Sequence, residues 1–423
     1  MTVVQGTRPR VNAGRLNGHI AALGDIGRGP GGGVTRLAFT AEDVQGRAYV
    51  AGLMLEAGLA VEVDAAGNLI GRRRGADGTA PALVLGSHID TVVNGGAYDG
   101  AYGVLAAVEV ARVLHEEGVR LRHPLVVVAF CDEEGAHGTM GMLGAHGFTG
   151  ALPAGFGEER DNRGITIADL LAAVGGDHLR LDEAAWTRDE IAAYLELHIE
   201  QGSVLERLGV PIGVVESITG RLNLTVTVEG VAGHAGTTPM EHRVDALDAA
   251  ARVLLAVRSI AADEGIVLRA TTGTCSVEPG MWNVIPGLVR LGVEFRDVTA
   301  SALDDAVARL GELAQEIAKA TGTQIEIGLG ARTTPVDCHP GLRDLIARCA
   351  AELGLSSHRL PSGAGHDAQI VARIAPIGMI FVPSTGGVSH APDEHTPPDQ
   401  LTQGADVLLS AVLQLDGGLV AGR

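Results

Sequence analysis

Residues 82–134 read ALVLGSHIDTVVNGGAYDGAYGVLAAVEVARVLHEEGVRLRHPLVVVAFCDEE, and the fold class follows from this segment. Ala82–Leu85 and Leu125–Phe130 are short apolar runs typical of buried strands, and Ala101–Glu117 between them has the apolar spacing of a helix. Strand, helix and strand in this order predict a βαβ unit with parallel strands. Ile377–Pro383 is a further run of this kind. The sequence therefore predicts an α/β fold with a mostly parallel central sheet.

The middle of the chain has a different pattern. Leu222–Glu229 alternates between apolar and polar residues, which indicates a half-exposed strand. The elements that follow are a helix at Val244–Ser259, strands at Leu268–Val277 and Leu288–Phe295, a helix at Leu303–Ala320 and a strand at Gln324–Leu329. This βαββαβ order predicts an inserted ferredoxin-like domain over residues 213–329. Residues 1–212 and 330–423 then build the larger α/β domain.

The composition argues against two classes of partner. The 423 residues suffice for two domains, and 46% hydrophobic with 20% charged residues is ordinary for a globular enzyme. The 32 basic and 51 acidic residues give a net charge of −19, which repels nucleic acids and anionic membranes. No apolar run is long enough to span a bilayer. We therefore expect no nucleic acid and no membrane as partner.

Two further features favour a cytoplasmic location. The N-terminal residues lack the apolar core of a signal peptide. The cysteines are scattered without a CxxC pair, which fits reduced thiols better than a disulfide framework; they are Cys131, Cys275, Cys338 and Cys349.

The glycine-rich Gly27–Gly33 is not followed by the Lys-Ser or Lys-Thr of a phosphate-binding loop. A nucleotide cofactor is therefore disfavoured.

Polar residues follow each of the three apolar runs. They are His88, Asp90 and Asp99 after the first run, Glu133 and Glu134 after the second, and His390 after the third. Because loops at the carboxyl ends of parallel strands open into one crevice, we expect these side chains to meet in space. Tyr194–Glu200 adds His198, which lies on the same strand face as Glu196 and Glu200.

Each cluster alone has an ordinary explanation, since a lone histidine is usually a loop residue and adjacent glutamates usually form a solvated turn. Together, three histidines and several carboxylates at one sheet edge favour a metal site, and a set without thiolates suits zinc, manganese or cobalt. A carboxylate behind a histidine fixes the tautomer of a metal ligand. A site for two ions about 3.5–4 Å apart also needs a bridging carboxylate and an acidic side chain that stays free as a base.

Longer motifs carry a resemblance to a known family. They are GSHIDTVVNGGAYDGAYGVLAAVEV, DEEG, ELHIEQG, GHAGTTPM with Arg243 and Asp245, and SGAGHDA followed by FVPSTGGVSH. Together they resemble the amidase/hydantoinase/carbamoylase family of dinuclear metal amidohydrolases, which includes N-carbamoyl-L-amino acid hydrolases, β-ureidopropionases and allantoate amidohydrolases. The resemblance runs from about Leu16 to His395. It implies a zinc-exopeptidase-like catalytic domain and an inserted lid and dimerisation domain, in a homodimer.

The resemblance also implies how a metal site is built. Asp99 would bridge two divalent ions, which are zinc or else manganese, cobalt or nickel. His88 and His198 would complete the shell of one ion. Glu134 and His390 would complete the shell of the other.

Further roles follow from the same resemblance. Glu133 would be the general base, and Asp90 would support His88. His234 of the partner subunit would stabilise the oxyanion, and Arg296 would hold the substrate carboxylate with its planar fork. The implied substrate contacts are Gln201, Asn283, Gly363, Ala364 and Gly365. Alternatives stay open, because His234 also fits packing within its own loop and Arg296 also fits a surface charge on an edge strand.

The sequence departs from the family pattern beyond the acidic pair. Relatives commonly carry Arg-Phe after EEG and GSR a little later, whereas this chain reads EEGAHG and LGAH there. His137 and His146 thus replace cationic or aromatic neighbours of the site. We expect this departure to affect the choice of substrate and not the metal chemistry.

We predict metal-dependent hydrolysis of a non-peptide C–N bond in a small, carboxylate-bearing amide or ureide. The first candidate is an N-carbamoyl-L-amino acid, which would give the amino acid, carbon dioxide and ammonia. The alternative is allantoate, another ureide or an N-acyl amino acid, since these differ only in the pocket they require. A non-catalytic metal-binding homologue is a remote alternative that the presence of Glu133 disfavours.

Overall fold

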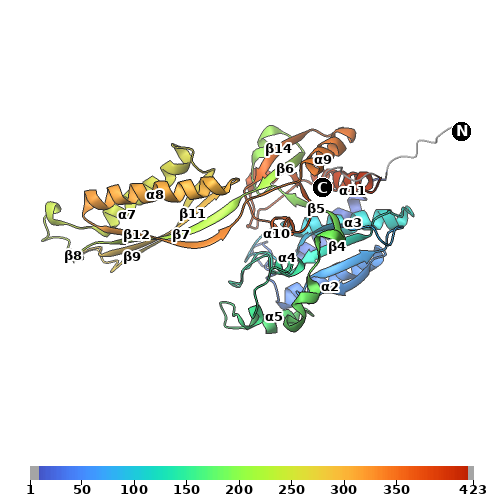
Figure 1. Cartoon of the computed structure of the whole chain (residues 1–423), viewed down its shortest axis with the longest axis horizontal. Helices are drawn as coiled ribbons and strands as arrows, with labels where there is room; N and C mark the ends of the chain where they lie inside the picture. The colour runs from blue at the N-terminus through green and yellow to red at the C-terminus, as the bar shows by residue number, and fades with distance from the viewer. Residues whose placement is uncertain (1–8, 418–423) are drawn as a thin grey trace. The chain divides into compact units, whose positions relative to one another are not determined.

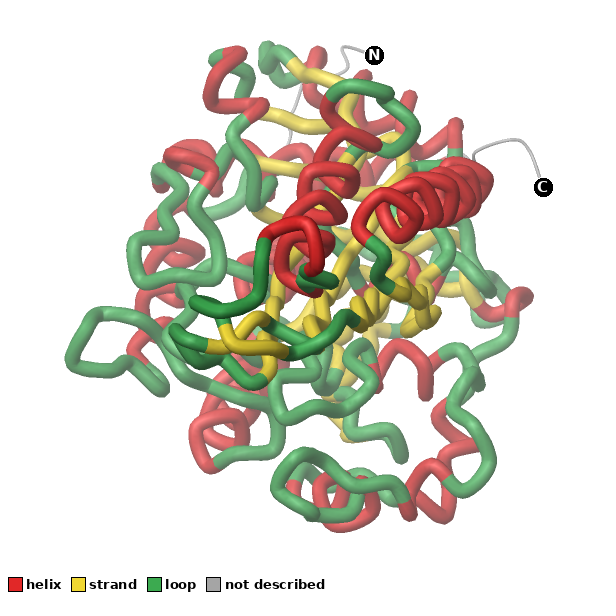
Figure 2. Tube along the Cα trace, turned by 90° about the vertical axis from the view of Figure 1, so that its left-hand side faces the viewer, coloured by secondary structure: helices red, strands yellow, loops and turns green. Residues whose placement is uncertain are grey.

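The structure, a computed structural model, describes residues 9–417 and divides into two compact units. The large unit contains the chain through Glu216 and again from Cys338, and the small unit spans Ser217–Asp337. Residues 1–8 and 418–423, which the sequence assigned to the larger domain, lie outside the described part. Loops and turns, green in Figure 2, make up much of the chain, as its 60 glycines lead one to expect.

The large sheet has the strand order β1-β2-β4-β3-β5-β15-β6-β13, and β14 also pairs with β6. Its strands are β1 (Ala60–Val63), β2 (Leu69–Arg73), β3 (Ala82–His88), β4 (Leu125–Phe130), β5 (Ile191–Ile199), β6 (Ile212–Ile218), β13 (Val336–Asp337), β14 (Ser357–Ser362) and β15 (Ile377–Val382). The four central strands β4, β3, β5 and β15 are parallel to their neighbours in this group. The predicted α/β fold with a mostly parallel central sheet is confirmed.

The segment that predicted the βαβ unit forms β3, α3 (Ala101–Glu116) and β4. Every residue of β3 and β4 is buried, which is why both strands are apolar without alternation. β3 continues beyond the predicted Leu85 to His88, because Gly86 and Ser87 still pair with β4. The strand therefore delivers His88 itself to the sheet edge.

Helices pack on the large sheet and bury a common apolar core with it. The helices are α1 (Ala13–Asp25), α2 (Ala41–Glu56), α3, α4 (Leu143–Phe148), α5 (Ile167–Ala173), α6 (Val204–Leu208), α9 (Pro340–Glu352), α10 (Asp367–Val371) and α11 (Pro398–Gly417), with short 3-10 turns η1 (Phe156–Glu158), η2 (His178–Ala184), η3 (Arg188–Glu190) and η5 (Thr385–Gly387). The core draws on α1, α2, α3, α9 and α11. A second apolar cluster lies around α4, α5 and η1.

The small unit contains a four-stranded antiparallel sheet with the order β12-β7-β11-β9. Its elements are β7 (Gly220–Glu229), β8 (Gly233–His234), η4 (Met240–His242), α7 (Ala246–Ala262), β9 (Arg269–Glu278), β10 (Val284–Ile285), β11 (Leu288–Asp297), α8 (Ala300–Thr321) and β12 (Gln324–Thr333). Figure 1 shows α7 and α8 on the same face of this sheet, where the alternating apolar residues of β7 and β11 are buried.

The cysteines and helices of the described residues bear on two sequence-based expectations. The four cysteines are thiols outside any disulfide; three are buried and Cys275 is exposed. Burial raises the pKa of the Cys131 thiol well above its usual value, so this residue is a core side chain without nucleophilic character. Among residues 9–417, no helix has the length and apolar character that crossing a bilayer requires.

Gly103 marks the closest approach of α3 to β5. A Cβ atom there would lie 2.2 Å from the carbonyl oxygen of Leu197 and 3.0 Å from the Cβ of Ser87. Because a backbone atom cannot yield without moving the strand, we expect Gly103→Ala to lower the free energy of unfolding by about 1–3 kcal/mol. Chemical denaturation measures this change.

Gly18 in α1 supplies the matched control, since it is exposed and nothing lies within 4 Å of its hypothetical Cβ. Gly18→Ala should raise the free energy of unfolding by about 0.5–1 kcal/mol, because alanine loses less backbone entropy in a helix. Two variants with equal stability would show that α3 does not pack this tightly on β5.

Candidate metal centre

The carboxyl ends of the parallel strands bring the predicted metal-site residues together. His88 is the last residue of β3 and His198 is the penultimate residue of β5, while Glu133 and Glu134 lie three and four residues beyond the end of β4. His390 lies in the loop beyond β15. All of them belong to the large unit, and all of them meet near the carboxylate of Asp99.

Asp99 is buried between three imidazoles. Its Oδ1 atom lies 3.1 Å from Nε2 of His198 and 3.7 Å from Nε2 of His88, and its Oδ2 atom lies 3.0 Å from Nε2 of His390. Each carboxylate oxygen therefore faces a different set of ligand atoms. This is the arrangement that a carboxylate bridging two cations requires.

The tautomers of two histidines show why a cation fits here. Nδ1 of His88 lies 3.0 Å from the backbone oxygen of Asp90, and Nδ1 of His198 lies 2.9 Å from that of Ile199. A carbonyl oxygen only accepts hydrogen bonds, so both Nδ1 atoms carry the hydrogen and the neutral rings turn their Nε2 lone pairs toward Asp99. Lone pairs that face a carboxylate oxygen repel it unless a cation or a proton lies between them.

Close backbone approaches hold Asp99 in place. Gly100 has a φ of 61°, and a Cβ there would lie 2.3 Å from Nε2 of His88. Glu394 accepts hydrogen bonds from the backbone N–H groups of Tyr98 and Asp99 at 2.9 and 3.1 Å. Glu394 was not predicted from the sequence. The only feature that points to it is its place in the DEH stretch shortly after His390.

Asp90 contacts His88, the residue it is predicted to support, and also binds the loop after β4. Its side-chain oxygen lies 3.7 Å from Nδ1 of His88, farther than its own backbone oxygen at 3.0 Å. The carboxylate instead accepts hydrogen bonds from the backbone N–H groups of Glu133 and Glu134 at 3.3 and 3.1 Å. Asp90 thus joins the loop after β4 to the end of β3, while its main chain sets the His88 tautomer.

Glu134 and His390 form the other side of the cluster. Oε1 of Glu134 lies 3.5 Å from Nε2 of His390 and, among the described residues, has no hydrogen-bond partner although it is buried. Burial and the nearby Asp99 raise the pKa of Glu134 to about 7. The contact with Asp99 raises the pKa of His390 to about 9. A bound cation would satisfy the orphaned oxygen and favour the ionised carboxylates.

The ligand-type atoms form compact groups that suit divalent metal ions. Within the described residues, three groups have atoms that lie within 4.8 Å of one another: His88 with Asp99 and His198, Asp99 with Glu134 and His390, and Glu196 with His198 and His366. The first two correspond to the two shells that the resemblance implies. Imidazole and carboxylate without thiolate is the donor set expected for zinc or manganese. The residues therefore fit a divalent metal centre.

Glu133 lies at the margin of this cluster. Its Oε2 atom is 3.8 Å from Nε2 of His88, which is longer than the contacts of Asp99 and Glu134 with the histidines of the centre. Burial, together with Asp367 and other acidic neighbours, raises the pKa of Glu133 well above its usual value. A carboxyl group that is buried, beside the cluster and not part of either compact group has the properties of a proton carrier.

A second layer of buried polar groups supports the centre. Glu196 accepts hydrogen bonds from Oγ of Ser87 at 2.9 Å, the hydroxyl of Tyr194 at 3.0 Å and the backbone N–H of Ala368 at 3.0 Å. The ring of His366 lies 4.6 Å from the ring of His198. The alternation of residues 194–200 predicted that Glu196 and His198 share a strand face. It did not predict that Glu196 joins β3, β5 and α10.

Gln201 and the Gly363–Gly365 turn lie in the large unit, as does the cluster. Nε2 of Gln201 donates to Oδ2 of Asp99 at 2.7 Å, so this side chain contacts the centre itself. Gln201 and His390 both adopt positive φ values, 58° and 57°, which non-glycine residues adopt mainly where function or packing demands it. Ala364 in the turn is bound to Oγ of Ser362, which also contacts Nε2 of His366.

His234 and Asn283 lie close together in the small unit. His234 is in β8, where it pairs with Val284 of β10, and the backbone oxygen of Asn283 accepts from the N–H of Ala235 at 3.0 Å. Nδ1 of His234 accepts from the backbone N–H groups of Gly236 and Thr237 at 3.0 and 3.3 Å. The ring is exposed, and its Nε2 therefore carries the hydrogen in the neutral form.

Arg296 lies on a central strand and not on an edge strand. Its cross-strand partners are Arg221 in β7 and Arg269 in β9, so three arginines stand side by side on the sheet face opposite α7 and α8. Nε of Arg296 contacts Oε1 of Glu294 at 2.7 Å. Oε2 of Glu294 also lies 4.0 Å from Nε of Arg221, so one carboxylate balances part of the positive charge, and the three arginines keep a net charge that favours an anion.

The two histidines that depart from the family pattern are largely buried. Nε2 of His137 and Nδ1 of His146 have no hydrogen-bond partner in the described part of the chain. Burial lowers the pKa of both imidazoles. The charge of Arg163 lowers the pKa of His137 further, and that of Arg373 lowers the pKa of His146 further. Both rings are therefore neutral groups where relatives of this family commonly carry cationic or aromatic ones.

Known proteins share this sequence and fold. Residues 84–414 match peptidase family M20/M25/M40. An N-carbamoyl-L-amino acid amidohydrolase of Geobacillus stearothermophilus is 43% identical over 96% of this chain and 98% of its own length. An allantoate amidohydrolase of Bacillus subtilis (strain 168) is 37% identical over 95% and 97%. The crystal structure of a hydantoinase/carbamoylase family amidase from Burkholderia ambifaria superimposes with a TM-score of 0.88 at 39% identity, covering 98% of this chain and 99% of that one.

These similarities extend over nearly the whole chain, and the matched segment contains the metal-site residues His88 to His390. The chain therefore belongs to peptidase family M20/M25/M40 and, within it, to the hydantoinase/carbamoylase group of amidohydrolases.

Proposed function

We propose that this protein hydrolyses N-carbamoyl-L-amino acids with the help of two divalent metal ions. The observation that carries this proposal is the position of Asp99 between two groups of ligand atoms, with Glu133 beside them and outside both. Water adds to the ureido carbon, and the bond from that carbon to the α-nitrogen breaks. The products are the free amino acid and carbamate, which decomposes to carbon dioxide and ammonia.

Each residue of the centre has a distinct task in this reaction. Bound cations would lower the pKa of the attacking water and polarise the ureido carbonyl group. His88, His198, Asp99, Glu134 and His390 would hold the ions. Glu133 takes the proton of the water and returns it to the leaving α-nitrogen. The carboxylate of Asp90 positions Glu133 by accepting a hydrogen bond from the backbone N–H group of Glu133.

The other interactions that the substrate needs would come from the small unit, with His234 contributed by the partner subunit, and from residues of the large unit. The Nε2–H of His234 is a free donor suited to a developing oxyanion. Arg296, flanked by Arg221 and Arg269, is suited to the α-carboxylate. Gln201, Asn283 and the turn of Gly363, Ala364 and Gly365 would complete the substrate contacts. Residues 213–329 would then act as a lid.

The small unit would also form a homodimer. It exposes large apolar side chains, with Trp282, Leu329 and Val231 at relative exposures of 102%, 70% and 63%. Exposed apolar groups of this size favour an interface with another chain. Thiols outside any disulfide fit a reducing compartment, which supports a cytoplasmic location.

A ureide such as allantoate is the second candidate substrate. It is favoured by the 37% identity to the allantoate amidohydrolase of Bacillus subtilis (strain 168). Allantoate also carries a ureido C–N bond, so the same metal centre could hydrolyse it. The neutral His137 and His146 are the residues whose type departs from the family pattern, so the choice between the two classes would depend on them.

Ammonia release from a panel of substrates tests the proposed function. The full chain, reconstituted with zinc, manganese or cobalt, should release ammonia from N-carbamoyl-L-amino acids faster than from allantoate and should release none after chelation. Acylated amino acids should yield the amino acid without ammonia. Release from allantoate alone would replace the first candidate by the second, and hydrolysis of none of these compounds would contradict the proposal.

Glu133→Gln separates the base from the metal ligands. The amide keeps the size of the side chain but cannot take up a proton, so we expect turnover to fall by about 10²–10⁴-fold while metal content stays near that of the wild type. Glu134→Gln is the matched control, because it removes a proposed ligand and should reduce metal content as well. Metal analysis and single-turnover kinetics measure both effects, and metal loss in Glu133→Gln would show that Glu133 is itself a ligand.

Arg296→Ala tests the carboxylate contact. Removing a guanidinium that binds a carboxylate should lower kcat/KM for N-carbamoyl amino acids by about 10–100-fold, corresponding to about 1.5–3 kcal/mol. The corresponding carbamoyl amino acid amides, which lack the charge, should change far less. Arg290→Ala is the matched control on the same strand, since Arg290 pairs with the exposed Glu278. Equal losses on acids and amides would argue against this role.

A further inference from the structure

A cavity of about 400 Å³ lies at the amino ends of the parallel strands, within the large unit. Its lining includes Leu83 at the start of β3, Ile191 at the start of β5 and Pro376 just before β15. The metal-site residues lie at the opposite, carboxyl ends of the same strands. With about 3.3 Å of rise per residue, a strand such as β3 places the two regions about 20 Å apart. The cavity is therefore separate from the proposed active site.

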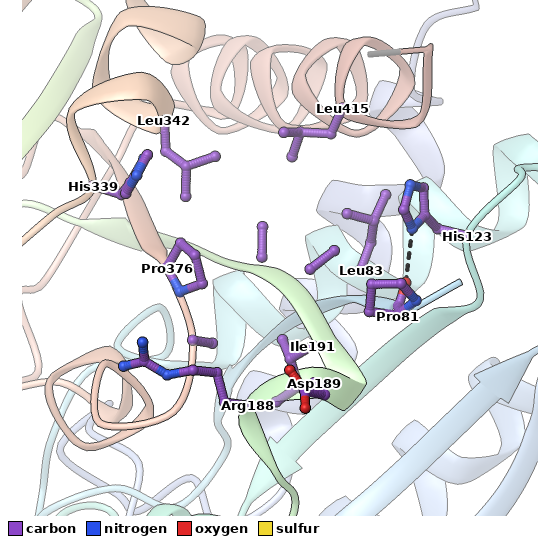
Figure 3. A pocket seen from close by; sticks show the side chains of 13 residues that line it. Pro81, Leu83, His123, Arg188, Asp189, Ile191, His339, Leu342, Pro376 and Leu415 are labelled. Carbon is purple, nitrogen blue, oxygen red and sulfur yellow. Dashed lines mark hydrogen bonds between the residues drawn. The ribbon is translucent and has the colours of Figure 1, made fainter. Parts of the chain in front are cut away.

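The body of the cavity is apolar. Leu83, Ile191, Leu342 and Leu415 contribute buried aliphatic side chains, of which Leu342 and Leu415 come from α9 and α11. Figure 3 shows Leu342 and Leu415 along one side of the space and Ile191 on the other. Its volume lies in the range of small-molecule sites, which are clefts or cavities of about 300–1,000 Å³.

One end of the cavity carries a buried hydrogen-bond acceptor. His123 is 1% exposed, and its Nδ1 lies 2.7 Å from the backbone oxygen of Pro81, the contact dashed in Figure 3. Because that oxygen only accepts, Nδ1 carries the hydrogen and Nε2 of the neutral ring is an acceptor. Among the described residues, Nε2 has no hydrogen-bond partner. An acceptor that is buried without a partner costs free energy, so a donor in the cavity would stabilise it.

The other end of the cavity carries the cationic Arg188 and a second imidazole, His339. Figure 3 places His339 and Arg188 opposite His123. Nδ1 of His339 is buried without a hydrogen-bond partner in the described part of the chain, and Arg188 is exposed at the rim. Asp189 also lines the cavity, but its carboxylate extends in a different direction from the guanidinium of Arg188. This end is suited to an anionic group.

We propose that this cavity binds a small carboxylate with an aromatic or aliphatic body and a hydroxyl or N–H group at its far end. The donor would bind Nε2 of His123, the apolar body would lie among Leu83, Ile191, Leu342 and Leu415, and the carboxylate would face Arg188. Such a ligand matches the order of acceptor, apolar walls and cation along the cavity. The inference does not rest on the reaction proposed for the metal centre.

Calorimetric titration of the metal-reconstituted full chain with para-hydroxyphenylpropionate tests the proposal. We expect saturable binding with one ligand per chain. Phenylpropionate, which lacks the hydroxyl, should bind about tenfold more weakly, because the buried acceptor stays unpaired. para-Ethylphenol, which lacks the carboxylate, should bind about fivefold more weakly, the effect of an exposed ion pair.

Variants locate the binding. Arg188→Ala should match the loss seen with para-ethylphenol, and Ala192→Phe, which adds a ring at a half-buried lining position, should abolish binding while the unfolding midpoint shows that the chain is folded. Arg180→Ala is the matched control, since Arg180 is exposed, pairs with Glu183 and does not line the cavity. None of these three changes should alter turnover in the absence of the ligand.

Three results would overturn the proposal. The first is the absence of binding at millimolar ligand. The second is equal affinity in the wild type, Arg188→Ala and Ala192→Phe. The third is binding that Arg296→Ala removes and Arg188→Ala leaves unchanged, which would place the ligand at the proposed substrate site.

Discussion

The structure of the centre depends on one electrostatic constraint, which is that the Nε2 atoms of the neutral His88 and His198 rings face the carboxylate of Asp99. Backbone carbonyl groups fix His88 and His198 with their Nε2 lone pairs toward a buried carboxylate, and Glu134 leaves a buried oxygen without a donor. In a protein interior such a set is unfavourable unless positive charge lies within it. Burial raises the pKa of Glu134 to about 7 and the contact with Asp99 raises the pKa of His390 to about 9, so both groups hold protons where cations would otherwise provide positive charge.

The fold meets this constraint by bringing backbone and side chains unusually close. Four parallel strands end at one edge, and the chain reverses at Gly100, where any side chain would collide with His88. Asp90 and Glu394 use their carboxylates on backbone N–H groups, so they hold the acidic loop and Asp99 without entering the cluster. The rigid sheet thus supplies the geometry, and the loops supply the charges.

Most of the fold could be predicted from the sequence, because buried parallel strands are apolar without interruption and Leu125–Phe130 is such a run along its full length. The residues that meet at the sheet edge could also be predicted, since strand ends converge. The contacts that support these residues could not be predicted. Glu394 acts through backbone N–H groups and Asp90 through the next loop, and contacts of this kind leave no periodic pattern in a sequence. The central position of Arg296 depends on strand order, which alternation does not specify.

The positions of His137 and His146 bear on the proposal that these residues affect substrate choice and not the metal chemistry. Neither residue belongs to the compact groups of ligand atoms, and burial keeps both rings neutral. A cationic side chain in their place would add charge near acidic groups and so would influence both the substrate and the cluster. A neutral imidazole changes shape and hydrogen bonding only. Under the proposed function, His137 and His146 would therefore alter substrate choice without a change in the residues around Asp99.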